Sequence, residues 1–422
     1  MRSSGEYKKI DYLPVILYGL IVIFGWLNIF SASRSEVFDF AMPYGRQLIW
    51  MAIAFVTAAI ILCFEPRFFS NGAYIFYVLS LLLLIATLFA GRVVNGARSW
   101  LYITNTIAFQ PSEIAKMCTA LAMAKYISGQ DVDLRQWRAW VPVFVILLIP
   151  MGLIILQHDM GSALVFICFV IPFYRFGFHR AFIRIGFAAV ILFILPQSGW
   201  FGQKYDNYII SGIVLLCCLF YLFIYIGKPK RKHYLVTLLA FSLCVGYIFA
   251  GDFLFSKLDA HQRDRFKVLF DPNYRLSDEG YNVHQSKIAI GSGGFAGKGP
   301  LHGTVTNAHF VPEQETDFIF CTVGEEYGFI GAAGLLLAYL WLLMHIIMMA
   351  ERQASAFARF YGYSVAAIFF FHIFINVSMV LGLMPCIGIP LPFLSYGGTS
   401  LLSFTILLFI FIRMDASHTS LL

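Results

Sequence analysis

Long apolar runs recur along almost the whole chain and constrain its fold more than any other feature. A membrane-spanning helix needs about 20 mostly apolar residues, with a range of about 17 to 25. Twelve segments qualify: residues 12–31, 48–64, 72–90, 107–127, 139–157, 161–178, 182–198, 207–227, 233–254, 319–349, 358–383 and 397–413. Charged residues make up only 13% of the chain, against about 25% in soluble domains. No water-facing surface could cover so many apolar runs.

These runs predict an all-α integral membrane protein, a polytopic helical bundle of 10–12 transmembrane helices with twelve favoured. We treat residues 1–422 as a single membrane domain. The fourth span is weak because it contains Glu113 and Lys116, and the seventh is weak because it is short. Ten spans are the alternative if residues 182–227 form something other than a hairpin of two spans.

Positive charges fall in the short gaps between apolar runs, and they set the expected orientation. Lys8 and Lys9 precede the first span. The gaps, together with the span ends beside them, carry Arg67, residues 125–138, Arg175 with Arg180, residues 228–232, and Arg352 with Arg359. With twelve spans these gaps share one side, so both termini are expected in the cytoplasm. The net charge of +7 therefore reflects membrane topology. Nucleic-acid binding is not indicated, because the sequence has no basic stripe with interleaved aromatic residues.

One expected exoplasmic loop, residues 255–318, is far longer than an ordinary connection. It is rich in charge and glycine and includes the run from Gly291 to Gly299. Long loops that are not linkers usually carry function, so we expect the chemistry in this loop and at the helix ends around it. The glycine run alone is weak evidence, because it lacks the strand and the spacing of a nucleotide-binding loop.

Two opposite charges lie inside the fourth predicted span. Glu113 and Lys116 are three residues apart and therefore share a helical face. Ionisable groups within a span are costly and tend to mark function. Two interpretations stay open: an internal ion pair that locks two helices together, or a Lys116 ammonium that faces an anionic substrate.

Asp159 lies at the expected exoplasmic turn between the fifth and sixth spans. Aspartate is a preferred N-cap residue, so a structural role at the start of the sixth span is one interpretation. A direct role in the chemistry is the other.

A group of acids crowds the exoplasmic entrance of the span 319–349. Its members are Glu313, Glu315 and Asp317, with Glu325 and Glu326 one or two turns deeper. Asp317 is followed at once by apolar residues, so it should lie at the membrane boundary, partly desolvated. Such a carboxylate can have a raised pKa and serve as a general base. The alternative is that these acids match the positive end of the helix dipole.

Basic residues in two exoplasmic loops form a further candidate site. They are Arg92 and Arg98 in one loop, and Lys287 and Lys298 in the long loop. Clustered cations beside glycine-rich backbone can hold a phosphate or pyrophosphate. Contact with lipid headgroups is the more common use of such residues.

The stretch from Gly388 to Ser400 should be irregular. It contains Pro390, Pro392, Ser395 and Tyr396 together with several glycines. Irregular backbone at membrane depth is tolerated only against protein or a water-filled cavity. The stretch is therefore expected to line a site before the last span.

Taken together, these segments resemble the SEDS family (shape, elongation, division and sporulation proteins), integral-membrane glycosyltransferases that polymerise peptidoglycan from lipid II. The matching motifs recur in family order and cover nearly the whole chain. They are Gly96-Ala-Arg98-Ser-Trp100, Gln110-Pro-Ser-Glu-Ile-Ala-Lys116, Gln157-His-Asp159-Met-Gly161, Gly280-Tyr-Asn-Val-His-Gln285-Ser-Lys287, Ile290-Gly-Ser-Gly-Gly294, Pro312-Glu-Gln-Glu-Thr-Asp317-Phe, Gly324-Glu-Glu326 and Pro390-Leu-Pro392 to Ser395-Tyr-Gly-Gly398. The long-loop motifs are similar to the branch that elongates the cell and sets rod shape.

Three departures from the family pattern stand out. Glu315 occupies a position that is usually His, and His158 one that is usually Pro. Glu315 would raise the pKa of Asp317 further or help to bind a divalent cation. The family typically has ten spans, so residues 199–232 look like an added transmembrane hairpin.

The resemblance implies a mechanism at the outer face of the bacterial cytoplasmic membrane. Asp317 would take the proton from the acceptor sugar's 4-hydroxyl, which attacks the donor's anomeric carbon and inverts it to a β-1,4 bond. Arg98, Lys116 and Lys287 would offset the charge of the leaving undecaprenyl pyrophosphate. Mg²⁺ or Mn²⁺ could assist, with Glu315 and Asp317 as its candidate ligands. The other predicted substrate-binding residues are Glu113, Asp159, Ser395 and Tyr396.

The resemblance also implies partners: lipid II, a class B penicillin-binding protein transpeptidase and other membrane proteins of the elongation complex, but no nucleic acid. The rival function is a lipid II flippase, which needs a polar path through the bilayer midplane. The chain offers little polarity there beyond Glu113, Lys116, Glu325 and Glu326. We therefore favour the enzyme.

Overall fold

The computed structural model describes residues 10–33, 39–94, 96–102, 108–129, 132, 134, 136–197, 206–225, 230–257, 260–270 and 279–417. The chain divides into two compact units, which are described separately. Unit 1 comprises Met1–Phe178 and Gln285–Leu422, and unit 2 comprises His179–His284. The candidate site residues all lie in unit 1.

The described residues are nearly all helical, which confirms the predicted fold class. The helices of the first part of unit 1 are α1 (Tyr12–Ala32), α2 (Pro43–Cys63), α3 (Pro66–Ala90), α4 (Pro111–Ile127), η1 (Trp137–Ala139), α5 (Trp140–Leu156), α6 (Met160–Val165), η2 (Phe166–Phe169) and α7 (Val170–Arg175). The later helices of unit 1 are α13 (Thr304–Asn307), α14 (Ile319–Glu351), α15 (Ala356–Val380) and α16 (Gly398–Asp415). Unit 2 contains α8 (Arg180–Ile194), η3 (Leu195–Gln197), α9 (Asp206–Phe220), η4 (Tyr221–Tyr225), α10 (Arg231–Lys257) and α11 (Ala260–Phe270), and α12 (Glu279–Gly293) runs from unit 2 into unit 1.

Helix coincides with each of the twelve predicted spans, although their lengths differ from the prediction. Within the described ranges, nine helices are long and apolar enough to cross a membrane by length and composition. The segments Met160–Arg175 and Ile183–Ile194 are shorter apolar helices, and α4 has 17 residues. The chain is therefore multi-pass, and the count of twelve stays a prediction.

The predicted added hairpin, residues 199–232, lies in unit 2. Its described parts are α9, η4 and the first residues of α10. Residues 199–205 and 226–229 lie outside the described residues. The hairpin therefore stays a prediction.

Proline sets the starts of several helices. Pro43, Pro66 and Pro111 stand in the first turns of α2, α3 and α4, where the missing N–H is not needed and the fixed φ suits a helix. Asp11 caps α1, because its Oδ1 accepts a hydrogen bond from the Leu13 N–H at 3.3 Å. Sequence chemistry thus fixes where these spans begin.

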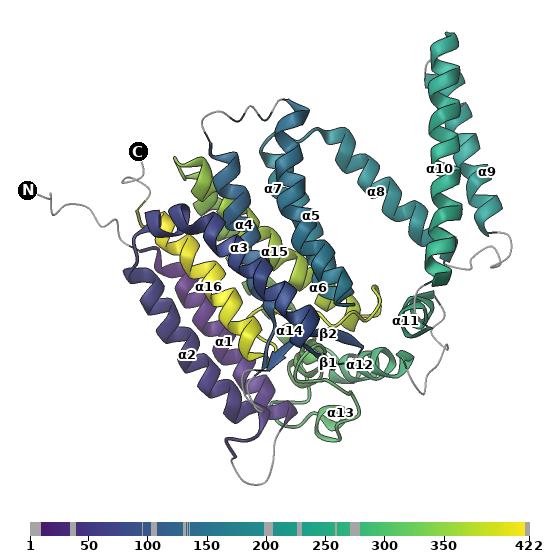
Figure 1. Cartoon of the computed structure of the whole chain (residues 1–422). Coiled ribbons are helices and arrows are strands. Elements are labelled where there is room, and N and C mark those ends of the chain that lie inside the picture. Colours follow the sequence, from purple (N-terminus) through teal and green to yellow (C-terminus); the bar gives the residue numbers. More distant parts are fainter. Residues whose placement is uncertain are drawn as a thin grey trace, which may run out of the picture. The chain divides into compact units, whose positions relative to one another are not determined.

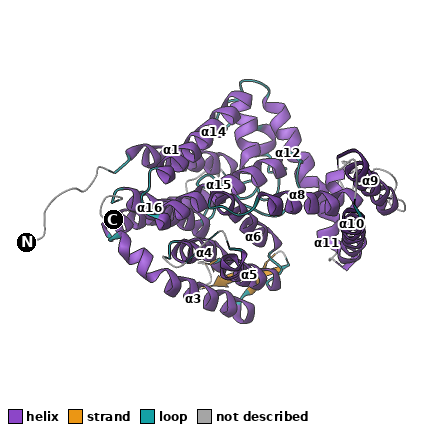
Figure 2. Ribbon diagram, turned by 90° about the horizontal axis from the view of Figure 1, so that it is seen from above, coloured by secondary structure: helices purple, strands orange, loops and turns teal. Residues whose placement is uncertain are grey.

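The interior of unit 1 is formed by α15 and α16. About four fifths of their spanning residues are buried, at 78% and 83%, against 28% in α2, α3 and α14. Figures 1 and 2 show α15 with α14 on one side and α4 on the other. Polar side chains on α15 therefore face protein, whereas the outer helices expose apolar side chains, as expected of a lipid-facing surface.

A small sheet interrupts the all-α pattern in the predicted loop 91–106. It consists of the antiparallel strands β1 (Arg92–Val94), β2 (Ala97–Tyr102) and β3 (Ala108–Phe109). The prediction missed it because the strands are very short and β3 lies inside the predicted fourth span. The helix of that span begins only at Pro111.

The long loop 255–318 is largely helical where it is described. It contains the end of α10, then α11, α12 and α13, while residues 271–278 lie outside the described residues. Its glycines have a packing role. A Cβ on Gly293 would fall 2.0 Å from the Gly324 carbonyl oxygen, and one on Gly297 would fall 2.2 Å from that of Glu326.

The predicted span 319–349 is broken near its start. Gly328 has φ 63° and ψ −161° inside α14, a conformation that L side chains rarely adopt. Glu325 and Glu326 lie before this break, next to the long loop. They therefore do not sit deep in a continuous span, as the sequence suggested.

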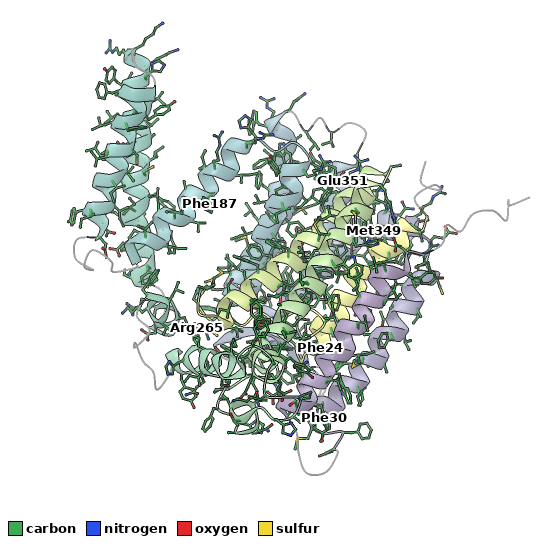
Figure 3. All side chains as sticks on the ribbon, turned by 180° about the vertical axis from the view of Figure 1, so that it is seen from behind. Phe24, Phe30, Phe187, Arg265, Met349 and Glu351 are labelled. Carbon is green, nitrogen blue, oxygen red and sulfur yellow. The ribbon has the colours of Figure 1, made fainter. Side chains whose placement is uncertain are left out.

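The loops expected on one side of the membrane meet at one end of unit 1. The Arg98 N–H donates to the Gln157 carbonyl at 2.8 Å, and the Gln314 side chain donates to the Ala32 carbonyl at 2.7 Å. Phe30 lies toward this end, and Glu351 lies at the other (Figure 3). We call the end that holds Asp317 the site end, and the end that holds Glu351 the charged end.

Candidate active site

An irregular stretch of chain forms the centre of the site end. Residues 385–397, which we call the rim segment, contain turns but no helix or strand. The predicted irregular stretch, Gly388 to Ser400, is therefore irregular up to Gly397, and its last three residues belong to α16. Gly388 has φ 68° and Phe393 has φ 65°. The segment lies between α15 and α16 in the chain, and side chains from α14 and α15 bind its carbonyl groups.

Asp317 lies in the turn that precedes α14, partly exposed. Its N–H donates to the Glu313 carbonyl at 3.2 Å, and its carbonyl accepts a hydrogen bond from Asn376 Nδ2 at 2.8 Å. Its carboxylate lies against Gly388, where an added Cβ would be 3.3 Å from Oδ2. The structure thus places this carboxylate at the helix boundary, next to the rim segment.

Two residues of α15 that sequence reasoning missed bind the rim segment. Asn376 Nδ2 also donates to the Ile389 carbonyl at 2.7 Å, and His372 Nδ1 lies 3.2 Å from the Pro390 carbonyl oxygen. Both side chains are almost fully buried. The sequence carries a signal for both, since each is a polar residue in a mostly apolar span.

Glu113 and Lys116 form a buried ion pair. Lys116 Nζ lies 2.8 Å from Glu113 Oε1 and 2.9 Å from His372 Nε2, and both side chains of the pair are 3% exposed. Ser403 on α16 donates to the Glu113 carbonyl at 2.8 Å. This geometry matches the interpretation of an internal pair that joins helices, here α4 with α15 and α16.

Asp159 caps α6. Its carboxylate accepts hydrogen bonds from the Ser162 N–H at 3.0 Å, the Ser162 hydroxyl at 2.9 Å and Gln110 Nε2 at 3.0 Å. The cap lies close to the rim segment, because a Cβ on Gly161 would be 2.3 Å from the Ile387 carbonyl oxygen. The capping interpretation therefore accounts for the contacts of Asp159.

Hydrogen bonds that involve main-chain groups hold Ser395, Tyr396 and Glu315 in place. The Ser395 hydroxyl accepts from the Leu391 N–H at 2.8 Å, and the Tyr396 N–H donates to the Glu315 carbonyl at 2.8 Å. Burial raises the pKa of the Glu315 carboxyl, and the negative charge of Glu313 raises it further. Ser395 is buried inside its own turn, and Tyr396 links the rim segment to the turn of Asp317.

The predicted cations lie on different elements. Arg98 is exposed on β2, with Nη1 donating to the Leu88 carbonyl at 3.2 Å. Lys287 is exposed on α12. Lys298 is engaged by protein, because its Nζ lies 2.7 Å from Glu325 Oε1. The structure thus brings Asp317, Glu315 and Tyr396 together, while Arg98, Lys287 and Lys298 lie on other elements.

Glu325 anchors the long loop. Its fully buried carboxylate accepts hydrogen bonds from the N–H groups of Val305 and Thr306, each at 2.9 Å, as well as from Lys298. Glu326 instead accepts a hydrogen bond from Ser31 on α1. Both acids therefore serve the packing around the break in α14.

A metal site made by protein alone is not found in the described part of the chain, where no three His, Cys, Asp or Glu residues gather closely enough. Mg²⁺ is usually held by one or two carboxylates together with substrate phosphates. Glu315 and Asp317 suit that pattern in donor type, and their role as metal ligands stays a prediction.

Fold and site define a class: a polytopic helical membrane protein with a partly exposed carboxylate at one end of an apolar bundle. The model of the FtsW, RodA and SpoVE family, described as cell cycle protein, matches residues 11–205 and 204–420. The chain belongs to this family, which is the SEDS family that its motifs predicted.

Named relatives cover nearly the whole chain. Peptidoglycan glycosyltransferase MrdB of Escherichia coli strain K12 is 30% identical over 398 residues, covering 94% of this chain and 91% of the relative. Peptidoglycan glycosyltransferase RodA of Treponema pallidum is 29% identical, covering 95% and 96%.

Solved structures agree. The crystal structure of RodA from Thermus thermophilus matches with a TM-score of 0.61 at 25% identity, covering 97% of each chain. A chain from a peptidoglycan synthase complex that coordinates polymerization and crosslinking matches with a TM-score of 0.68 at 26% identity, covering 97% of this chain and 98% of that one.

Proposed function

We propose that this chain is a peptidoglycan glycosyltransferase that polymerises lipid II into β-1,4 glycan strands at the outer face of the bacterial cytoplasmic membrane, for cell elongation and rod shape. The observation that carries the proposal is the Asp317 carboxylate, partly exposed at the helix boundary and lying against Gly388. The names of the relatives, MrdB and RodA, support the same activity.

Asp317 acts as the general base in this proposal. It takes the proton from the acceptor sugar's 4-hydroxyl, the hydroxyl oxygen bonds to the donor's anomeric carbon, and the bond to the pyrophosphate oxygen breaks. A general base contributes about 10²–10⁴-fold to a rate. The apolar outer surface of the bundle suits polyprenyl tails, which stay in the membrane while the sugars react at its edge.

The charges of the leaving pyrophosphate need partners near this end. Arg98 and Lys287 are exposed cations and remain our candidates. Lys116 is a weaker candidate, because Glu113 and His372 already occupy its ammonium. A divalent cation held by Glu315 or Asp317 together with the pyrophosphate would supply further positive charge.

Orientation and partners complete the proposal. Both termini face the cytoplasm, since the basic gaps belong to that side. The protein works with a class B penicillin-binding protein transpeptidase, an inference supported by the similar chain in a peptidoglycan synthase complex.

The rival flippase requires polar groups along the bilayer midplane. Glu325 and Glu326, two of the four charges that could line such a path, lie beside the break in α14 and bind protein groups. The other two, Glu113 and Lys116, neutralise each other. The described residues therefore favour the enzyme.

The test is glycan polymerisation by the purified full chain with lipid II, in the presence and absence of the transpeptidase. Asp317→Asn keeps the side-chain shape and should lower the rate by about 10²–10⁴-fold. Glu313→Gln, a change at an exposed acid in the same turn, is the matched control and should stay active. Lipid II that crosses proteoliposome membranes without any polymer would support the flippase instead.

A further inference from the structure

Two polar side chains stand one helical turn apart on the buried face of α15. His372 is 1% exposed and Asn376 is 0% exposed, and residues at i and i+4 share a helical face. Polar groups inside a span are costly. Their contacts should therefore explain why the chain carries them.

Asn376 uses both hydrogens of its amide. One is directed to the Asp317 carbonyl at 2.8 Å and the other to the Ile389 carbonyl at 2.7 Å. Its Oδ1 is buried without a hydrogen-bond partner among the described residues, and such a group costs free energy. The residue is thus suited to donating, and its two acceptors belong to the turn of Asp317 and to the rim segment.

His372 holds the next carbonyl of the rim segment. The Lys116 ammonium, 2.9 Å away, can only donate, so His372 Nε2 must accept. The proton of a neutral ring then resides on Nδ1, which donates to the Pro390 carbonyl at 3.2 Å. This tautomer links the Glu113–Lys116 ion pair to the rim segment through one imidazole.

We propose that His372 and Asn376 are positioning residues for Asp317, and that together they fix the position of the turn of Asp317 relative to the rim segment. The proposal rests on the proposed function of Asp317 as the general base. Asn376 binds the main chain of Asp317 itself, and His372 binds the residue beside the one that Asn376 holds. Asp317 is thereby fixed against Gly388 by donors that water cannot reach.

The expected effect is on turnover. A displacement of about 1 Å in a reacting group can cost about 10²-fold in rate. Asn376→Leu, which keeps the branched shape and the number of heavy atoms and removes both donors, should lower kcat per folded protein by at least about tenfold and leave KM for lipid II nearly unchanged. The rate must be referred to folded protein, because a residue that only stabilises the fold would lower the amount of active protein and so the apparent kcat, also without a change in KM.

Asn28→Leu is the matched control. Asn28 is also fully buried in a span, but its amide donates to the Phe24 carbonyl of its own helix at 2.7 Å. The control variant should keep a kcat near that of the wild type. Melting temperatures of both variants in detergent show that folded protein is being compared.

Asn376→Asp and His372→Phe provide two further readouts. The carboxylate introduced by Asn376→Asp would, when ionised, face two carbonyl oxygens without a donor, and protonation restores one donor. The loss of kcat in Asn376→Asp relative to the wild type should therefore become smaller as the pH falls. His372→Phe keeps the ring against Phe404 and removes both nitrogens. Because both residues act through the rim segment, the double variant should lose less activity than the product of the single losses.

The outcomes separate the two proposals. If the wild type is active and Asn376→Leu has the same kcat as Asn28→Leu, the positioning role is wrong and the proposed function still stands. A wild type that makes no glycan under any condition removes the proposed function, and the positioning role with it. An active wild type with a loss of kcat confined to the α15 variants supports both.

Discussion

The two ends of unit 1 are held together by different chemistry. At the charged end, ionised side chains pair with one another: Arg175 with Glu351 at 2.8 Å, and Arg352 with Asp11 at 3.0 Å. At the site end, buried neutral donors bind main-chain carbonyls, as Tyr339 does with Pro392 at 2.5 Å. Exposed ion pairs contribute little, whereas buried donors fix backbone position. The buried donors to the rim segment and to the Asp317 carbonyl should therefore hold the backbone near Asp317 more firmly than the exposed Arg175–Glu351 pair holds the charged end.

The largest expected effect comes from removing the anchor of the long loop. Glu325→Ala leaves the buried N–H groups of Val305 and Thr306 without their acceptor, at a cost of about 3–5 kcal/mol. The melting temperature should fall steeply. Thr304→Val removes only one exposed hydroxyl donor to the same carboxylate and should cost much less. Equal losses in the two variants would show that the backbone donors of the loop are not what Glu325 holds.

Gly388→Ala tests the packing against Asp317. The added Cβ would lie 3.3 Å from Asp317 Oδ2, so we expect about a 10²-fold loss of kcat. Gly96→Ala is the control, because Gly96 also has a positive φ, 82°, but nothing lies within 4 Å of an added Cβ. Similar kinetics in both variants would indicate backbone strain alone and contradict the contact with the carboxylate.

The pH dependence of stability should report the burial of Glu315. Burial raises the pKa of this carboxyl, so the folded state favours the protonated form. Its contribution to stability is complete below the unfolded pKa and is lost as the pH rises through the raised folded pKa. The melting temperature of Glu315→Gln relative to the wild type should therefore increase as the pH rises above about 4, the ordinary pKa of glutamate. If the melting-temperature difference between Glu315→Gln and the wild type does not vary with pH, the pKa of Glu315 is not raised in the folded state.

The smallest effect is expected at the charged end. Arg175 and Glu351 are 54% and 44% exposed, so Arg175→Met should leave the melting temperature and kcat indistinguishable from the wild type. A clear loss of activity would mean that the charged end also positions the site, and the contrast between the two ends would fail.

The sequence predicts the helices and one part of the site well. Apolar runs of about 20 residues specify helix, and prolines and glycines specify the irregular rim segment. The boundary position of Asp317 follows from the apolar residues after it. These features depend on local composition, which a single sequence displays.

The contacts that assemble the site depend on residues distant in the chain. Asn376 lies 59 positions from Asp317 and binds its carbonyl, and main-chain acceptors leave no signature in a sequence. The break at Gly328 was missed for a related reason: glycine is common in membrane helices, and only the approach of Gly297 makes this one necessary. The rule that polar residues in spans mark function would have found His372 and Asn376 if applied beyond charged residues.

Glycines at the end of α12 and in the turn after it pack directly against glycines of α14, which restricts how these segments can move. Between Gly293 and Gly324, and between Gly297 and Gly328, backbones touch without intervening side chains, and the Phe329 N–H donates to the Gly294 carbonyl at 3.0 Å. Two elements joined so closely cannot slide past each other. We expect the last turn of α12 and the first turns of α14 to move as one rigid unit. The turn that carries Asp317 directly precedes α14 and should move with it.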